Sequence, residues 1–136
     1  MDSSNTFSGR ANNYTFGRPD YPVKLIEALY SDYGVSTNSI IADIGSGTGK
    51  FSRQLLDKGS TVICVEPNDD MRLTAEKELS SYSNFRSVKG TYNATSLKNE
   101  SVDFITSAQA FHWFDELVFK EECNRILRSM GKVALV

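Results

Sequence analysis

The hydrophobic residues of this chain form short, largely β-branched runs that alternate with segments of helical spacing. A short apolar run bounded by Gly, Pro or Asn predicts a buried strand, and apolar positions three or four residues apart predict an amphipathic helix. The stretch 90–101 is predicted to be a loop. The pattern predicts strands over 40–44, 61–66, 85–88, 102–107 and 132–136, and helices over 22–33, from 51 onward, over 69–81 and over 116–130.

The first and last predicted helices carry signals for their ends. Pro22 suits the first turn of the helix over 22–33, and Gly34 suits its stop. In the helix over 116–130, regularly spaced apolar residues form a core-facing stripe, and Gly131 is expected to cap the helix. The two apolar faces consist of Leu25, Ile26, Leu29 and Tyr33 in the first helix and of Phe119, Cys123, Ile126, Leu127 and Met130 in the last.

Strands that alternate with helices pair in parallel, through right-handed crossovers that place helices on both faces of the sheet. The predicted fold class is therefore α/β, with an open, doubly wound, mostly parallel sheet. The 136 residues are expected to form one domain, with a core over 22–136 behind a polar arm over 1–21. This arm contains side chains that a simple linker would not need: Phe7, Tyr14, Phe16 and Arg18.

Composition narrows the classes of partner. A net charge of −2 without a basic run gives no reason to expect nucleic acid or an anionic membrane. No apolar segment approaches the roughly 18 residues that span a bilayer, and the first residues lack signal-peptide features, so a cytoplasmic location is expected. Cys64 and Cys123 are predicted to be buried, reduced thiols, and no metal site is expected with one histidine in the chain.

Three glycines, two residues apart, follow the first predicted strand in the segment 43–49. Glycine permits positive φ and removes the Cβ atoms that would block a ligand on the main chain, and the next helix begins with unpaired N–H groups. The dinucleotide fingerprint would need glycine where Lys50 stands, and a Walker A loop would need glycine at Ile44 and Ser or Thr at Phe51. The spacing therefore fits neither phosphate loop. A glycine-rich turn without function is the alternative to a nucleotide site.

The topology brings other polar residues to the same place, because such sheets bind ligands beyond the carboxyl ends of their strands. Glu66 ends the second strand, where a carboxylate can accept hydrogen bonds from both ribose hydroxyls. The alternative for Glu66 is an exposed strand-end acid. Asp43 is expected to orient the loop and to lie near an ammonium group of the ligand, because a carboxylate prone to burial needs such a partner or several N–H donors. The segments 90–95 and 107–113 follow the third and fourth strands and reach the same edge.

The D-x-G-x-G-x-G pattern of residues 43–49 resembles motif I of the class I S-adenosylmethionine (SAM)-dependent methyltransferases, where the loop lies against the amino-acid part of SAM. The segments 65–71 and 108–115 resemble later motifs of that superfamily. Together with the arm motif of Phe7, Tyr14, Arg18, Pro19, Tyr21 and Pro22, the second segment is similar to the trans-aconitate methyltransferase-like branch. The resemblance implies a Rossmann-like methyltransferase fold, SAM as cofactor and methyl transfer to a small-molecule carboxylate, hydroxyl or similar acceptor. The expected cofactor-binding residues are Asp43, Gly45, Ser46, Gly47, Thr48, Gly49, Glu66, Pro67, Met71, Thr91, Tyr92, Asn93, Ser107 and Gln109.

One feature departs from that family. The loop 90–94 has no acid to accept a hydrogen bond from the adenine amino group, so Thr91, Asn93 and backbone are expected to make this contact. Because SAM already carries an electrophilic methyl group, the protein mainly needs to align a nucleophile and exclude water. His112 is the candidate general base or substrate-orienting group, with membership of an aromatic cluster as its alternative. Tyr14 is a candidate catalytic residue that lines the methyl group.

Members of this family generally continue after the fifth strand with a helix and an antiparallel hairpin. This sequence stops at that strand, so we expect a truncated methyltransferase that retains the SAM-binding half. A SAM-binding or regulatory module without turnover is the alternative, and a nicotinamide-dependent oxidoreductase is disfavoured by the glycine spacing. An uncovered apolar edge over 132–136 predicts pairing with a second copy of the chain. The sequence does not identify the methyl acceptor.

Overall fold

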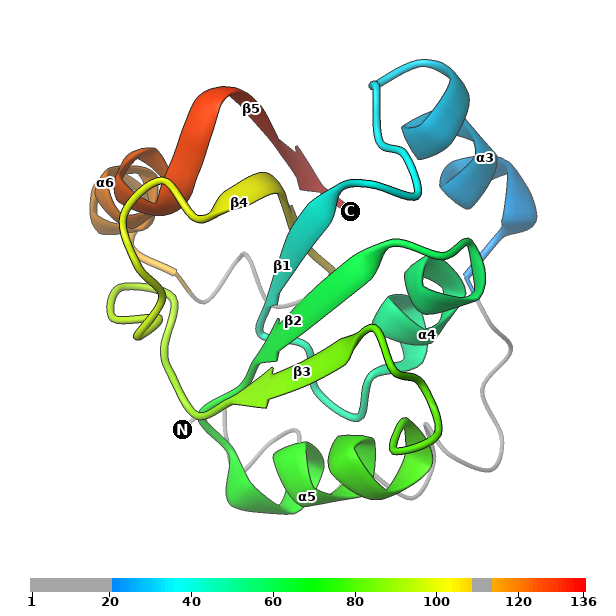
Figure 1. Ribbon diagram of the computed structural model, residues 1–136. Helices are drawn as coiled ribbons and strands as arrows, with labels where there is room; N and C mark the ends of the chain where they lie inside the picture. Colours follow the sequence, from blue (N-terminus) through cyan, green and yellow to red (C-terminus); the bar gives the residue numbers. More distant parts are fainter. Residues whose placement is uncertain (1–20, 109–113) are drawn as a thin grey trace.

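The computed structural model describes residues 21–108 and 114–136. It contains a five-stranded parallel sheet with the strand order β3-β2-β1-β4-β5 (Figure 1). This topology confirms the predicted open, doubly wound α/β sheet. In chain order the elements are α3 (Val23–Ser31), β1 (Ile40–Ile44), α4 (Lys50–Asp57), β2 (Thr61–Val65), α5 (Asp69–Glu78), β3 (Phe85–Val88), β4 (Val102–Ser107), α6 (Glu116–Ile126) and β5 (Leu127–Leu135).

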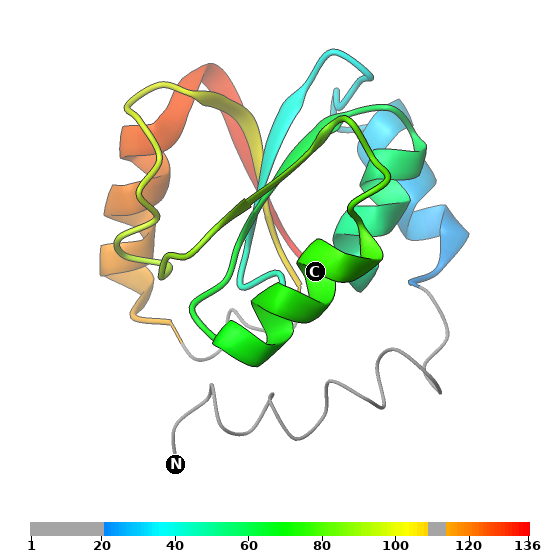
Figure 2. The ribbon, with the colours of Figure 1, turned by 60° about the horizontal axis from the view of Figure 1, so that its bottom comes forward.

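Helices cover both faces of the sheet: α3, α4 and α5 lie on one side and α6 on the other (Figure 2). The central strands are therefore buried on both faces, which explains their almost continuous apolar sequences. Ile41 packs in the core that contains Leu55 of α4, whereas its neighbour Ala42 packs in the core that contains Ile126 of α6. Side chains of β1 thus alternate between two cores, and together the two cores fix the position of this strand.

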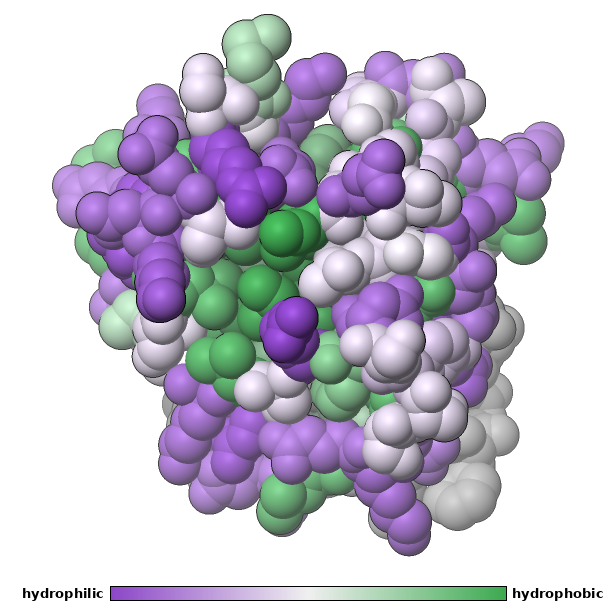
Figure 3. Space-filling view, in the orientation of Figure 1, coloured by the Kyte–Doolittle hydropathy of each residue, from purple (hydrophilic) through white to green (hydrophobic). Residues whose placement is uncertain are grey.

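The face covered by α6 is only partly enclosed. Ile40 and Ile63 belong to its core cluster but are only partly buried. Hydrophobic side chains are visible there between α6 and β3, over β1 and β2 (Figure 3). None of the helices in the described ranges has the length and hydrophobicity needed to span a membrane.

The last helix is shorter than predicted and the last strand is longer. α6 ends at Ile126 and β5 begins at Leu127, whereas the hydrophobic pattern predicted helix to residue 130 and strand from residue 132. The N–H groups of Glu100 and Ser101 donate to the carbonyl oxygens of Arg125 and Ile126. The loop before β4 therefore satisfies the end of the helix, and Leu127 pairs with Val102 instead of continuing the apolar stripe.

Met130 and Gly131 do not have their predicted roles. Met130 was expected on the core-facing stripe, but it is 91% exposed and has a φ of 72°. Gly131 was expected to cap the helix, but it lies within β5, where the pairing with β4 is irregular. A Cβ atom at Gly131 would lie 2.7 Å from the Leu127 side chain and 2.9 Å from the Arg128 carbonyl oxygen. Glycine is thus required here for close approach, not for helix termination.

The end of α3 also differs in one residue. Gly34 has a φ of 83° and the Val35 N–H returns to the Leu29 carbonyl, so the predicted stop is confirmed. Tyr33, however, was expected on the apolar face of the helix and is 54% exposed beyond its end. Tyr33 lines a cavity of about 370 Å³ that lies between the end of α3 and the irregular part of β5, at the amino edge of the sheet.

A buried carboxylate fastens the loop between β3 and β4 to α6. Glu122 is 8% exposed, and its carboxylate accepts hydrogen bonds from the N–H and the hydroxyl of Thr95, at 2.9 and 2.7 Å. Arg125 donates to the same carboxylate and also to the side chain of Asn99. The Arg125 guanidinium, together with the Thr95 donors, lowers the pKa of Glu122 to about 2. This network fixes a loop that has no regular secondary structure of its own.

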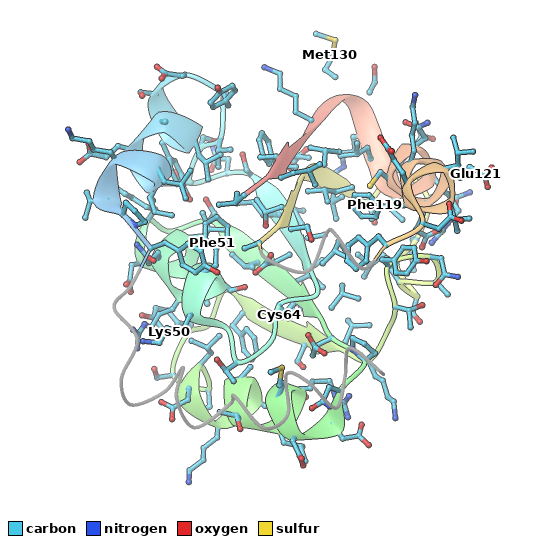
Figure 4. The ribbon with its side chains drawn as sticks, turned by 180° about the vertical axis from the view of Figure 1, so that it is seen from behind. Lys50, Phe51, Cys64, Phe119, Glu121 and Met130 are labelled. Atoms are coloured by element: carbon cyan, nitrogen blue, oxygen red, sulfur yellow. The ribbon has the colours of Figure 1, made fainter. Side chains whose placement is uncertain are left out.

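We expect Glu122→Gln to lower the free energy of unfolding at pH 7 by about 1–2 kcal/mol, because the hydrogen bonds from Arg125 and Thr95 lose their charged acceptor while solvent screens the partly exposed Arg125. Because this pKa is lower in the folded than in the unfolded chain, the stabilisation is present above about pH 4.5 and is lost as the pH falls toward about 2. Urea unfolding of both proteins from pH 2 to 7 measures the difference. Glu121→Gln is the matched control, because Glu121 is an exposed neighbour on the outer side of α6 (Figure 4). An equal loss in the two variants would contradict the prediction.

Candidate functional site

The loop after β1 is held in shape by its three glycines and by backbone hydrogen bonds. Gly45, Gly47 and Gly49 have φ values of 71°, 62° and 86°, a region that other residues rarely adopt. The N–H groups of Gly45 and Ser46 donate to the carbonyl oxygen of Val65, at 2.8 and 3.3 Å. The loop therefore turns back over the end of β2, at the carboxyl edge of the sheet where ligands of this fold class bind.

The glycines differ in what surrounds them. A Cβ atom at Gly49 would lie 2.7 Å from Leu79 Cδ1 and 3.4 Å from Ala75 Cβ. Among the described residues, a Cβ atom at Gly47 would meet only the sulfur of Met71, at 3.7 Å. Gly49 is thus needed to pack the loop against the α5 segment, and Gly47 leaves main chain open beside Met71. The general expectation of an open glycine backbone fits Gly47 but not Gly49.

Glu66 connects the loop after β1 to the turn after β2. Its two carboxylate oxygens accept hydrogen bonds from the Gly47 N–H at 2.8 Å and from the Asn68 N–H at 2.9 Å. Glu66 is 6% exposed, so the alternative of an exposed strand-end acid is wrong. Burial raises the pKa of Glu66, and the two N–H donors act against that rise. Each oxygen retains a lone pair for a further donor.

Asp43 lies beneath the loop in a cluster of small polar groups. It is 1% exposed, and its carboxylate accepts hydrogen bonds from the hydroxyls of Ser52, at 2.6 Å, and Thr106, at 3.0 Å. The Cys64 thiol lies 3.1 Å from the Ser52 hydroxyl. Burial raises the pKa of Asp43 to about 6, and the charge of nearby Glu66 adds to the rise. Among the described residues, the Asp43 carboxylate accepts from these two hydroxyls and from no backbone N–H group.

Ser52 and Thr106 were not among the predicted site residues. Both are completely buried, and both approach Asp43 from elements packed against β1: Ser52 from α4 and Thr106 from β4. The available signal was a polar residue at a buried position of an otherwise apolar pattern. Serine beside Phe51 on the inner face of α4 fits that description, because a buried hydroxyl needs a partner.

The loop after β3 forms a compact turn at the same edge. Thr91 and Ala94 exchange two backbone hydrogen bonds, and the Thr91 hydroxyl donates to the Asn93 side chain at 2.7 Å. Thr91 and Asn93 are exposed and retain acceptor atoms. Tyr92 stacks on Phe114 with ring centroids 4.3 Å apart, and its hydroxyl accepts the N–H of Asp115. Tyr92 therefore connects this loop to the start of α6.

The remaining predicted site residues occupy different positions. Met71 and Thr48 are buried beside the loop, and Pro67 is half-buried. The Ser107 hydroxyl donates to the Ile44 carbonyl oxygen, so it joins the ends of β4 and β1. The Ser46 hydroxyl is buried and makes no well-formed hydrogen bond within the described part of the chain, although Cys64 is close enough to interact with it. Gln109, His112 and Tyr14 lie outside the described residues.

This geometry defines a nucleotide-type site of the doubly wound α/β class, with a glycine loop, two buried acids and no phosphate-binding signature. The sequence pattern of the family described as "Methyltransferase domain" matches residues 42–135. The chain therefore belongs to the methyltransferase domain family. S-adenosylmethionine is the cofactor of this class, and the site fits it: Gly47 offers open main chain, and the two acids suit a ligand with cationic groups.

Similar proteins agree with this assignment. An uncharacterised methyltransferase-like protein of Schizosaccharomyces pombe is 31% identical over 132 residues, which cover 96% of this chain and 50% of that protein. A solved structure assigned as a SAM-dependent methyltransferase from Methanococcus maripaludis matches 97% of this chain and 62% of its own, with a TM-score of 0.83 and 20% identity. A methyltransferase from Anabaena variabilis, assigned to an antibiotic biosynthesis pathway, is 32% identical with a TM-score of 0.73, over 86% of this chain and 45% of that one. The chain spans about half the length of the curated relatives it matches.

The two glycine environments predict different stability losses. At Gly49, alanine would combine a strained positive φ, about 1–3 kcal/mol, with an overlap against Leu79 of similar size. At Gly47, alanine would have the backbone strain alone. We expect Gly49→Ala to be less stable than Gly47→Ala by at least about 1 kcal/mol in urea unfolding at pH 7. Equal losses, or a larger loss at Gly47, would show that the loop does not depend on α5 in this way.

Proposed function

We propose that this chain binds S-adenosylmethionine across the glycine loop and takes part in methyl transfer to a small-molecule acceptor. The observation that carries the proposal is the bond from the Gly47 N–H to Glu66. This bond joins the two segments that would hold the amino-acid and ribose parts of the cofactor. Because their relative position is fixed before binding, little ordering would oppose cofactor uptake.

The proposed contacts follow from the position of each residue. The main chain of the loop 45–49, beside Met71 and Asp43, would hold the amino-acid end of SAM. Glu66 would accept hydrogen bonds from the ribose hydroxyls. Pro67 and the exposed Thr91 and Asn93 would border the adenine, with Tyr92 holding that loop in place. Ser107 joins the ends of β4 and β1 beside this site, and Gln109 follows it in the sequence.

When bound, the cofactor supplies an electrophilic methyl group on a sulfonium sulfur. The residues of this chain would then need only to align the acceptor, exclude water and, where the acceptor carries a proton, remove it. We propose His112 for the proton-removing or orienting role and Tyr14 for lining the methyl group. The support for both is their sequence motifs. Loss of turnover in His112→Ala with unchanged SAM binding is the expected result.

The small-molecule acceptor rests on the resemblance to the trans-aconitate methyltransferase-like branch. It is also supported by the Anabaena relative, which is assigned to an antibiotic biosynthesis pathway. The net charge of −2 supplies no electrostatic attraction for a nucleic-acid acceptor. A carboxylate or hydroxyl compound is therefore the proposed acceptor class.

A second candidate is a SAM-binding module that does not turn over. The described site residues account for the cofactor, whereas His112 and Tyr14, which we propose to act on the acceptor, lie outside the described residues. The strand β5, which forms one edge of the described sheet and exposes Val133 and Leu135, would also allow pairing with a second copy of the chain. The oligomeric state in solution tests that pairing.

Calorimetric titration with SAM, with its demethylated product S-adenosylhomocysteine and with NAD shows which cofactor the chain binds. We expect both sulfur compounds to bind and NAD not to bind. Glu66→Gln should weaken SAM binding at least about tenfold, because the amide nitrogen cannot accept one of the two N–H groups. Glu76→Gln is the control, since Glu76 accepts the hydroxyl of Ser87 and is not among the residues proposed to hold the cofactor. A preference for NAD would end the proposal.

A further inference from the structure

We propose that cofactor uptake removes a proton from the Asp43 carboxyl group, so that the affinity of this site for SAM falls when the solution is acidified below neutrality. This inference rests on the proposed cofactor site. It adds that the site is built to take a cationic ligand and that its occupancy responds to pH.

Asp43 has no positively charged partner among residues 21–108 and 114–136. Asp43 is 1% exposed, and its two oxygens accept hydrogen bonds from the hydroxyls of Ser52 and Thr106. No basic side chain of the described residues forms an ion pair with it. A hydroxyl group can either donate or accept a hydrogen bond, so it can rotate to suit the protonated or the ionised form of Asp43. The cluster therefore tolerates both the acid and the carboxylate.

In the described part of the chain, the titratable groups near Asp43 bring no positive charge to it. Glu66, at the end of β2, brings a second negative charge, and Cys64 on β2 brings a thiol whose pKa is raised to about 12 by burial. Lys50 begins α4, but it lies at the outer edge of the molecule, whereas Cys64 lies in the middle of the sheet (Figure 4). Two buried acids thus share one end of the sheet: Asp43 lies two residues before Gly45, and Glu66 accepts the N–H of Gly47.

A bound cation shifts the protonation equilibrium of Asp43 toward the carboxylate. A positive charge within about 4–6 Å favours an ionised carboxylate and lowers its pKa by roughly 1–3 units. SAM carries an ammonium and a sulfonium group, and the loop that would hold its amino-acid end lies directly above Asp43. With the cofactor present, the O–H bond of Asp43 breaks, the electron pair stays on the carboxylate and the proton passes to solvent. No other reactant is needed.

The expected change of SAM affinity with pH depends on the pKa of Asp43 in the protein without cofactor, which burial raises to about 6. If only the ionised form binds the cofactor tightly, affinity falls about tenfold between pH 7 and pH 5. At pH 6 about half a proton is released for each cofactor bound. The pH range of the comparison ends at pH 7, because an α-amino group such as that of the ligand loses its proton at about pH 7.7–8.0.

The test is calorimetric titration of the 136-residue chain with SAM from pH 5 to 7, in two buffers of different ionisation enthalpy. The wild-type chain should show the tenfold change and the proton release. Asp43→Asn should bind SAM more weakly at pH 7, and the Asp43-dependent slope and proton release should be lost. Asp32→Asn, at the exposed end of α3, is the control and should keep the wild-type profile.

The outcomes separate this inference from the proposed function. Absence of SAM binding at every pH would overturn the proposed cofactor site. SAM binding with no proton release, or a tenfold slope that persists in Asp43→Asn, would overturn the inference alone. Adenosine carries no cation, so its pH profile should be the same in the wild-type chain and in Asp43→Asn.

Asp43→Asn is expected to fold. An acid whose pKa is higher in the folded chain than in the unfolded chain stabilises the fold less as the pH rises from about 4 to about 6. A neutral side chain removes this effect, so Asp43→Asn should melt no lower than the wild-type chain at pH 7. Infrared spectra of the wild-type chain give an independent measurement: a protonated-carboxyl C=O band near pH 5.5 should weaken when SAM is added. A band that does not change would contradict the inference.

Discussion

The contact on which the site depends is the Glu66 carboxylate between two backbone N–H groups. It holds Gly47 of the loop after β1 and Asn68 of the turn after β2, two segments separated by α4 and β2 in the chain. Parallel pairing of β1 and β2, with Ile44 opposite Val65, brings both segments to one edge of the sheet. The sheet register therefore determines which segments meet at the site, and the hydrogen bonds to Glu66 fix the loop in its position.

The same carboxylate explains why the loop tolerates so much positive φ. Three glycines in the left-handed region cost conformational entropy on folding, and the loop gains few apolar contacts in return. The hydrogen bonds to Val65 and Glu66 and the packing of Gly49 on Leu79 offset that cost. A loop fixed by hydrogen bonds from one side keeps its other side available to a ligand.

Most of the fold could be predicted, because strand and helix periods and the glycine spacing are local signals. The exceptions came from contacts between residues far apart in sequence. The end of α6 is set by N–H groups of Glu100 and Ser101, and no pattern within residues 116–130 could reveal that. In the site, Asp43 and Glu66 were recognisable from spacing, but the hydroxyls of Ser52 and Thr106 were not, since they reach Asp43 only after α4 and β4 have packed.

Two buried carboxylates, Asp43 and Glu122, differ in their hydrogen-bond partners. Glu122 is paired with Arg125 and accepts an N–H, and its pKa is lowered to about 2. Asp43 has neither kind of partner within the ranges that the structure describes, and its pKa moves in the opposite direction, to about 6. The chain places an arginine beside Glu122 but only hydroxyl groups beside Asp43. A positive charge on a bound ligand would therefore compensate the buried charge of Asp43. The position of that acid, under a loop with open main chain at Gly47, makes a cationic ligand the natural source of the balance.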